Sequence, residues 1–334
     1  MAWSDELRAR AIRDLPRLLE RHPELQLDAA HAHVATNWTA FGTAGSAPVV
    51  VKHFAQRERW MNEVACLRHL AATGSVPQVI DGDCEPFLIA ERLPGEDATL
   101  GYRTIHAAAT GLPALSHAIG QAQGRLTAFP LPVSGRGYCP VRDFTVMPWP
   151  ADPQQMLSHY LDICRRIVQV LPEYGTGIFE PSLALLSAQL PSIGLRRRCL
   201  FHEDIANLKI DQGRFAGFFD LEMCRAGTDM MQLGVGLQCC GPGRLSWRFF
   251  KRGFEDGAGQ VLTSDDLHSA VAMHHLYAWL RICRWGWWDG DPAQLGHLRD
   301  SESEIAYWRT FLTDSVAMMH AEADLSAICT AAGL

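Results

Sequence analysis

The sequence lacks several features that would place the protein in a specialised class. Its ten cysteines include no Cys-x-x-Cys pair, so it has no zinc or dithiol redox motif of that kind. No run approaches the roughly 20 apolar residues that span a bilayer. Residues 1–22 also lack the basic stretch and apolar core of a secretory signal. We therefore expect a cytoplasmic protein with reduced thiols and no membrane partner.

Positive charge is scarce relative to negative charge. The chain has 30 Lys and Arg residues against 37 Asp and Glu residues, which gives a formal net charge of −7. A nucleic-acid-binding surface needs clustered Lys and Arg side chains to neutralise phosphates. The charge balance excludes nucleic-acid binding as the main function and is compatible with a cationic substrate.

What the sequence does contain is apolar residues arranged with two different periods. Its 334 residues, 48% of them hydrophobic, are enough to bury a large core in two lobes. Strand-like patterns, including a hairpin turned at residues 42–46, dominate the first part, together with helical patterns over residues 4–22 and 60–71. Helical periodicity dominates afterwards. The sequence predicts an α+β fold with a small β-rich lobe, residues 1–92, and a larger, mainly helical lobe, residues 93–334.

One lysine and one glutamate occupy positions that a core normally excludes. Lys52 ends the run VVVK and shares a strand face with Val50 and Phe54, and Glu63 lies on the apolar stripe of the next helix. A lone buried charge is costly, so an ion pair between Lys52 and Glu63 would satisfy both side chains. The alternative is a half-exposed lysine and a solvated glutamate.

The stretch FHEDIANLKIDQGRFAGFFDLEMC, residues 201–224, combines a hairpin with a group of polar side chains. Residues 208–210 and 215–219 have the pattern of two short strands joined by the turn Asp-Gln-Gly. Asp204 and Asn207 precede the first strand and Asp220 ends the second. The open end of the hairpin is therefore expected to bring these three side chains together.

The three side chains offer only oxygen ligands to a metal. Two carboxylates and a carboxamide suit a hard cation such as Mg²⁺ better than zinc. In this arrangement Asn207 and Asp220 would hold the metal, and Asp204 would accept a proton from an attacking hydroxyl.

Taken in order along the chain, these motifs resemble the aminoglycoside phosphotransferase and choline kinase family of small-molecule kinases. That family has a lysine on a strand, a glutamate on the next helix, a His-x-Asp loop, an asparagine and a metal-binding aspartate. The matching residues here are Lys52, Glu63, His202, Asp204, Asn207 and Asp220. The segment FLIAERLPGE resembles the hinge strand between the lobes. Five elements in this order are far more specific than any one of them, and the resemblance covers about residues 30–240.

The resemblance implies a protein-kinase-like fold that binds ATP between its lobes. The adenine would lie against the hinge near Glu91 and Leu93. The segment FGTAGSA, with Gly42 and Gly45, stands where the family has its glycine loop, although it is weak evidence by itself. Lys52 would bind the α and β phosphates.

The rest of the implied site surrounds the transferring phosphate. Glu63 would orient Lys52, and Mg²⁺ would be held by Asn207 and Asp220. Asp204 would orient and deprotonate the acceptor hydroxyl. His202 would have a structural role in the loop.

The sequence departs from the family pattern at three places. Only Ile205 and Ala206 separate Asp204 from Asn207, whereas the usual loop has four residues there. Gln232 stands where the family commonly has an aspartate. The metal-binding segment reads DLE rather than Asp-Phe-Gly, which makes Glu222 either an extra metal ligand or a structural carboxylate.

An aromatic cluster in the C-terminal part is the candidate for the acceptor site. The segment WGWWDGD contributes Trp285, Trp287, Trp288 and Asp289, which could bind a sugar or a cation by stacking and cation–π contact. The tryptophans are as well explained by packing, and Asp289 by a turn. Trp279 lies at helical spacing and is expected to be core.

The leading interpretation is an ATP-dependent kinase that phosphorylates an alcohol group of a small molecule. Its acceptor would be an aminoglycoside, an amino sugar, a choline-like alcohol or an amino-acid alcohol, and the sequence selects neither one of these nor an oligomeric state. A protein kinase ranks lower because no Asp-Phe-Gly or Ala-Pro-Glu element follows Asp220. A catalytically silent nucleotide-binding protein is also compatible with the motifs. A metal-dependent hydrolase would use the Asp and Asn side chains but would leave the Lys52–Glu63 pair unexplained.

Overall fold

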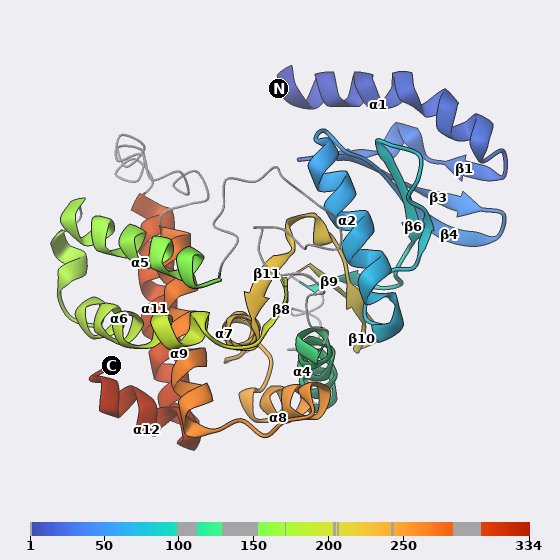
Figure 1. The fold of residues 1–334 in the computed structure, drawn as a ribbon. Helices are drawn as coiled ribbons and strands as arrows, with labels where there is room; N and C mark the ends of the chain where they lie inside the picture. Colours follow the sequence, from blue (N-terminus) through green and yellow to red (C-terminus); the bar gives the residue numbers. More distant parts are fainter. Residues whose placement is uncertain are drawn as a thin grey trace.

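The chain forms a β-rich N-terminal part and a mainly helical C-terminal part, which confirms the predicted α+β class (Figure 1). In Figure 1 the sheet lies at the upper right, in blue and cyan, and the helices coloured green to red lie to its left and below. This computed structural model describes residues 2–98, 112–128, 153–170, 172–202, 205, 207–241, 244–282 and 302–334. The lobe boundary between residues 92 and 93 stays a prediction.

The N-terminal part is an antiparallel sheet with the strand order β1-β3-β4-β6-β5, in which β2 also pairs with β3. The predicted hairpin is present, and it turns at Gly45, whose φ of 61° favours glycine. The strands are β1 (Leu25–Leu27), β2 (His33–Val34), β3 (Trp38–Ala44), β4 (Ala47–His53), β5 (Val79–Asp81) and β6 (Phe87–Glu91).

Two helices cover the two faces of this sheet. Because side chains alternate along a strand, Val49 and Val51 of β4 point into an apolar cluster shared with α1 (Ala2–Arg21). Val50 packs against the other cluster, which contains the apolar residues of α2 (Arg57–Leu70). Lys52 lies on the same side as Val50, so its ammonium group is directed towards α2.

A second group of short strands lies between the sheet and the helices. β8 (Arg198–Phe201) pairs with β11 (Arg225–Thr228). The predicted hairpin consists of β9 (Leu208–Asp211) and β10 (Arg214–Phe218), and β7 (Glu96–Asp97) adds a third strand. The hairpin loop has positive φ at both Gln212 and Gly213, as expected for a two-residue type I′ turn.

Helices complete the C-terminal part and pack around β8, β10 and β11. None of the helices within the described residues has an apolar stretch long enough to cross a membrane. The helices are α4 (Leu112–Ala128), α5 (Pro153–Val170), α6 (Phe179–Gly194), α7 (Asp229–Gln238), α8 (Trp247–Ala258), α9 (Ser264–Ile282), α11 (Glu302–Ala321) and α12 (Ala323–Ala332).

Candidate functional site

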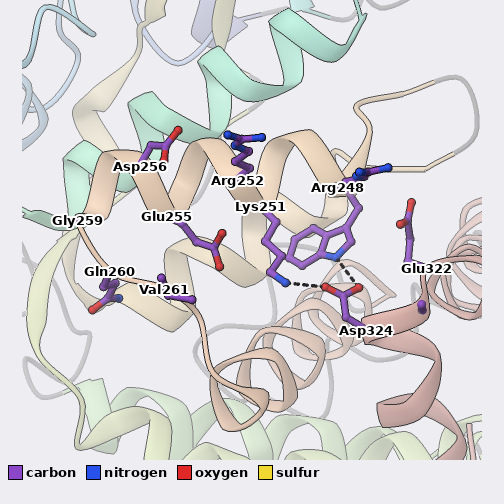
Figure 2. Close-up of a pocket in the computed structure, with 12 residues that line it drawn as sticks. Arg248, Lys251, Arg252, Glu255, Asp256, Gly259, Gln260, Val261, Glu322 and Asp324 are labelled. Atoms are coloured by element: carbon purple, nitrogen blue, oxygen red, sulfur yellow. Dashed lines mark hydrogen bonds and ion pairs between the residues drawn. The ribbon is translucent and has the colours of Figure 1, made fainter.

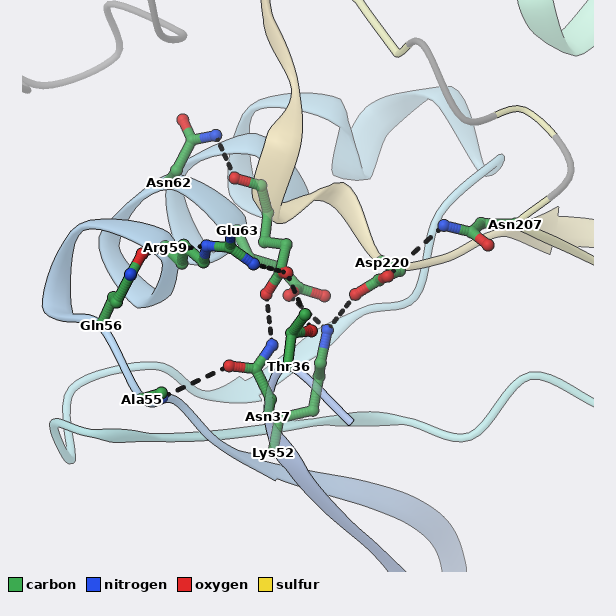
Figure 3. A network of polar contacts seen from close by, with 11 residues as sticks. Thr36, Asn37, Lys52, Ala55, Gln56, Arg59, Asn62, Glu63, Asn207 and Asp220 are labelled. Carbon is green, nitrogen blue, oxygen red and sulfur yellow. Dashed lines mark hydrogen bonds and ion pairs between the residues drawn. The ribbon is translucent and has the colours of Figure 1, made fainter. Parts of the chain in front are cut away.

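One lysine and two carboxylates from distant parts of the chain meet between the sheet and the hairpin (Figure 3). The Lys52 ammonium lies 2.6 Å from Oε2 of Glu63 and 2.5 Å from Oδ1 of Asp220. The Lys52 and Glu63 side chains are 11% and 4% exposed. The predicted Lys52–Glu63 ion pair is therefore present and buried, and the alternative of a solvated glutamate is wrong.

The open end of the β9–β10 hairpin places Asn207 beside Asp220, as the sequence predicts. The backbone N–H of Phe219 donates to the carbonyl of Asn207 at 2.9 Å, which closes the hairpin at this end. The side-chain amide of Asn207 then reaches Oδ2 of Asp220 at 3.4 Å. Asp204 lies outside the described residues, so its expected place beside these two side chains stays a prediction.

Asp220 has a backbone conformation that is uncommon for its residue type. Its φ and ψ are 60° and 56°, in the left-handed region that a residue with a Cβ seldom adopts. The chain then turns at once into a short 3-10 helix, η4 (Leu221–Met223). This bend directs the Asp220 carboxylate towards Lys52, and strained residues of this kind concentrate at functional sites.

We call Lys52, Glu63, Asp220 and Glu222 the Lys52 cluster. Its negative charge exceeds its positive charge, because one ammonium group faces three carboxylates. Burial opposes protonation of Lys52, but Glu63, Asp220 and Glu222 outweigh it and raise the pKa of this lysine. Burial also opposes ionisation of Asp220, but Lys52 outweighs it and lowers the pKa of that carboxyl. Burial raises the pKa of Glu63 to about 7, and repulsion from Asp220 and Glu222 adds to this effect against the attraction of Lys52.

The donor set of this cluster fits a hard divalent cation. Carboxylate oxygens of Glu63, Asp220 and Glu222 lie within 4.8 Å of one another. Oxygen-only ligands are the chemistry that Mg²⁺ prefers, and a cation there would offset the excess negative charge. The carboxamide of Asn207 lies next to Asp220, to which its nitrogen donates.

Glu222 has partners that sequence reasoning missed. Arg59 donates to its Oε1 at 2.8 Å, and Thr36 contacts the same oxygen at 3.5 Å. The amide group of Asn37 donates to Oε2. The amide nitrogen of Asn62 donates to the backbone carbonyl of Glu222 at 2.8 Å. The only sequence signal was the polar Asn62 among apolar residues of α2, because Thr36 and Asn37 belong to a turn far away in the sequence.

His202 and Gln232 are joined by two hydrogen bonds. The backbone N–H of His202 donates to Oε1 of Gln232 at 2.9 Å, and Nε2 of Gln232 donates to the His202 carbonyl at 3.2 Å. The His202 ring is buried, with Nδ1 3.5 Å from Sγ of Cys224. This environment supports the structural role proposed for His202.

The other residues that the sequence predicts to bind the nucleotide lie in β3, in the turn that follows it, and at the end of β6 or just after it. Gly42 lies within β3, where an added Cβ would overlap the carbonyl of Gln26 in β1, so close strand packing already explains it. Glu91 ends β6, and Leu93 approaches the hairpin at Gly217. The nucleotide-binding roles of Gly42, Gly45, Glu91 and Leu93 stay predictions.

The expected acceptor residues Trp285, Trp287, Trp288 and Asp289 lie outside the described residues. A cavity of about 780 Å³ does occur elsewhere, between α8 and the start of α12 (Figure 2). Its charged groups are partly paired, since Lys251 lies 2.8 Å from Asp324. None of its lining residues belongs to the Lys52 cluster, so this cavity is separate from the candidate site.

Comparisons with known proteins were made for both the sequence and the fold. A family model described as "Phosphotransferase enzyme family" matches residues 28–249, which is more than half of the chain. No curated protein matches the sequence. The fold, in contrast, resembles many solved structures.

Three of these structures illustrate the likeness. A thermostable mutant of aminoglycoside phosphotransferase APH(4)-Ia, in a ternary complex with ADP and hygromycin B, has a TM-score of 0.57 and 15% identity, covering 91% of this chain and 97% of that chain. Macrolide 2′-phosphotransferase MphH from Brachybacterium faecium has a TM-score of 0.53 and 14% identity, covering 91% and 98%. A choline/ethanolamine kinase family protein from Mesorhizobium loti has a TM-score of 0.54 and 14% identity, covering 98% and 99%. At these identities the likeness shows the fold, and it confirms the predicted kinase-like architecture.

Proposed function

Because this chain belongs to the phosphotransferase enzyme family, we propose that it transfers the γ-phosphate of ATP to a hydroxyl group of a small molecule. The observation that carries the proposal is the buried contact of Lys52 with both Glu63 and Asp220. A lysine fixed between two carboxylates beside an Asn–Asp pair is suited to hold a polyphosphate together with its cation. A hydrolase that uses only the Asp and Asn side chains would not need this lysine.

The site residues that the structure describes each have a role in the proposed reaction. Lys52 binds the α and β phosphates, and Glu63 keeps its ammonium group in place. Asp220 and Asn207 would hold Mg²⁺, which when bound would neutralise charge on the transferring phosphoryl group. Glu91 and Leu93 border the adenine site. Phosphoryl transfer of this kind depends on positioning and charge stabilisation rather than on covalent catalysis.

Proton transfer is assigned to Asp204. Its carboxylate accepts the proton of the acceptor hydroxyl while the hydroxyl oxygen attacks the γ-phosphorus and ADP leaves. A well-placed general base typically contributes about 10²- to 10⁴-fold to the rate. The acceptor belongs to one of four classes: aminoglycosides, amino sugars, choline-like alcohols or amino-acid alcohols. The residues proposed to contact it are Trp285, Trp287, Trp288 and Asp289.

Thermal unfolding with ATP and Mg²⁺ tests nucleotide binding and catalysis separately. Wild-type protein should show a Mg²⁺-dependent rise in Tm with ATP, which Asp220→Ala should weaken because a metal ligand is lost. Asp204→Asn should keep the rise, and turnover should fall by about 10²-fold or more in both variants. The acceptor for turnover is found by screening the four classes of alcohol above.

Asp97→Asn is the matched control for this experiment. Asp97 lies on β7 and its carboxylate pairs with Lys209 at 2.6 Å, outside the Lys52 cluster. This variant should behave as wild type in both assays. A wild-type protein whose Tm does not respond to ATP and Mg²⁺ would contradict the proposed function.

The shortened loop favours one second candidate, a nucleotide-binding protein without transfer activity. With only Ile205 and Ala206 between Asp204 and Asn207, the base and the metal ligand are closer along the chain than in the family pattern. This candidate predicts the same ATP-dependent rise in Tm but no phosphorylated product with any acceptor. ³¹P NMR of the screened reactions separates the two candidates.

A further inference from the structure

Glu222 is a buried carboxylate whose donors all come from the N-terminal part of the chain. Its side chain is 4% exposed. Arg59 and Thr36 both contact Oε1, and Asn37 donates to Oε2. A carboxylate oxygen has two lone pairs, so Arg59 and the longer contact of Thr36 occupy both lone pairs of Oε1, and Asn37 occupies one of the two on Oε2. The charge of Glu222 is met by the guanidinium of Arg59.

Asn62 holds the backbone at Glu222 and just after it. Its amide nitrogen donates to the carbonyls of Glu222 and Cys224, both at 2.8 Å. Two acceptors use both protons of the amide group. Asn62 is 1% exposed, so without it two buried carbonyls would lose a partner. α2 is therefore bonded to the segment after Asp220 through both Arg59 and Asn62.

The segment bound to α2 is η4, which follows Asp220 and fixes the orientation of its carboxylate. Asp220 has left-handed backbone angles, and a residue with a Cβ keeps them only where its surroundings enforce them. Lys52 contacts the Asp220 carboxylate from one side. On the chain side, the bend is fixed by η4, which begins at the next residue and is attached to α2.

We propose that Arg59, Asn62 and Glu222 form a clamp that fixes the Asp220 bend on α2, with Glu222 acting as a positioning residue and not as a metal ligand. This inference rests on the proposed function, because its purpose is to hold Asp220 ready for Mg²⁺. The clamp makes α2 the common support of Glu63 and Asp220, so both carboxylates keep their places around Lys52 together.

Hydrogen exchange in the nucleotide-free protein tests the clamp directly. Asn62→Leu and Arg59→Met should speed exchange in peptides that cover residues 220–228, because the bend loses its attachment. The matched control is Arg57→Met. Arg57 is in the same turn of α2 and pairs with Glu85 at 3.2 Å, but it does not touch the clamp. Arg57→Met should exchange at the wild-type rate in these peptides.

The Mg²⁺ requirement tests what the clamp does for the site. The Mg²⁺ concentration that gives half of the ATP-induced rise in Tm should increase about 10- to 100-fold in Arg59→Met, as is typical when the support of a metal ligand is removed. The rise in Tm caused by ATP without Mg²⁺ should be unchanged, because Lys52 is intact. Arg59→Lys, which keeps a cation beside Glu222, should restore part of the wild-type Mg²⁺ affinity.

Two results would overturn the inference. In one, Arg59→Met and Asn62→Leu show wild-type exchange and a wild-type Mg²⁺ requirement. In the other, Glu222→Gln raises the Mg²⁺ requirement but leaves hydrogen exchange in residues 220–228 at the wild-type rate, as expected if Glu222 binds the metal itself and does not hold the bend. If Asn62→Leu does not fold, Arg59→Met alone decides, since Arg59 is at the edge of the cluster. If wild-type protein does not respond to ATP and Mg²⁺, the proposed function fails and the exchange experiment still decides on the clamp.

Discussion

At the scale of single residues, the hydrogen bonds of Gln232 explain why a glutamine stands where the family commonly has an aspartate. Its carboxamide accepts from the N–H of His202 and donates to the carbonyl of the same residue. A carboxylate at this position accepts hydrogen bonds but does not donate them. Gln232 is fully buried, so it fixes the backbone of His202, two residues before Asp204, without placing a charge there.

We predict that Gln232→Glu destabilises the protein by about 1–3 kcal/mol at pH 8, because the His202 carbonyl loses its donor and faces a buried carboxylate. Chemical denaturation followed by circular dichroism measures this. The loss should shrink as the pH falls, since a protonated glutamic acid donates again. A raised pKa in the folded variant gives this sign: the folded state binds the proton more tightly than the unfolded state, so lower pH favours folding.

Gln232→Met is the control, because it removes both hydrogen bonds without adding a titrating group. Its stability relative to wild type should not depend on pH over this range. A Gln232→Glu variant as stable as wild type at pH 8 would show that the hydrogen bond from Gln232 to the His202 carbonyl does not matter.

The sequence predicts the contacts of some site residues and not of others. Lys52 and Glu63 could be paired because each interrupts an apolar pattern, and the hairpin could place Asn207 beside Asp220 because strand pairing fixes which ends meet. The partners of Glu222 follow no such rule. They depend on how the β2–β3 turn and α2 pack against η4, which is a tertiary arrangement.

At the scale of elements, the closest packing within the described helices involves four glycines of α4 and α8. A Cβ on Gly120 or Gly124 of α4 would overlap a carbonyl of α8, and a Cβ on Gly253 or Gly257 of α8 would overlap a carbonyl of α4. The two glycines of each helix are four residues apart, so they lie on the same face of that helix. The absence of side chains here lets the two backbones approach each other directly.

We predict that Gly253→Ala lowers the free energy of unfolding by about 1–3 kcal/mol, because the new Cβ meets the carbonyl of His117 and the helices must separate. The sign is the informative part. In an exposed helix the same change would stabilise the protein by about 1 kcal/mol. Urea denaturation of the variant and of the wild type measures the difference.

Arg252→Ala is the matched control, since Arg252 is the exposed neighbour of Gly253 on α8. Its effect should stay within about 0.5 kcal/mol, as is usual for surface substitutions. A stabilising Gly253→Ala would mean that the two helices are not in close contact.

The elements found by sequence pattern are the long ones. The helices and the strands of the two hairpins have enough residues for a period to show. β8 and β11 were not predicted, because RCLF begins with the last of three consecutive arginines and RAGT contains a glycine, so neither looks like a buried strand. They pair because the chain brings them together. β1, β7 and α12 were missed as well, the two strands because they have three and two residues.

At the scale of the whole molecule, two adjacent histidines are buried in the helical core. His274 and His275 of α9 are 1% and 0% exposed. The His275 ring lies 2.7 Å from the hydroxyl oxygen of Ser182, and His274 stacks on Phe311. Burial lowers the pKa of His275 to about 3 and lowers the pKa of His274 as well, to which His275 and Arg244 add.

We predict that the free energy of unfolding falls as the pH is lowered from 7 to 5, partly through these histidines. In the unfolded chain a histidine binds a proton near pH 6.5, whereas in the folded protein His275 stays neutral until about pH 3. The stability is therefore complete above pH 6.5 and is lost as the pH falls. Each such histidine accounts for about 2 kcal/mol between pH 7 and 5.

The variant His275→Gln checks this share, because its amide group keeps a hydrogen bond to Ser182 but does not titrate. Its loss of stability between pH 7 and 5 should be about 2 kcal/mol smaller than that of wild type. Equal slopes in wild type and His275→Gln would contradict the prediction.

The division of the sheet between two apolar clusters has a consequence for how the chain is made. Within the described residues, the cluster on the α1 side consists of residues from Leu7 to Ile89, so it can form as soon as this part has left the ribosome, where chains fold from the N-terminus. The apolar side of α2, with Val64, Leu67 and Leu70, shares its cluster with residues from the rest of the chain as far as Cys329. Leu88 and Ala90 of β6 already cover part of that side, but the rest stays uncovered until the C-terminal residues of the cluster are made, and aggregation of the nascent protein is expected to begin there.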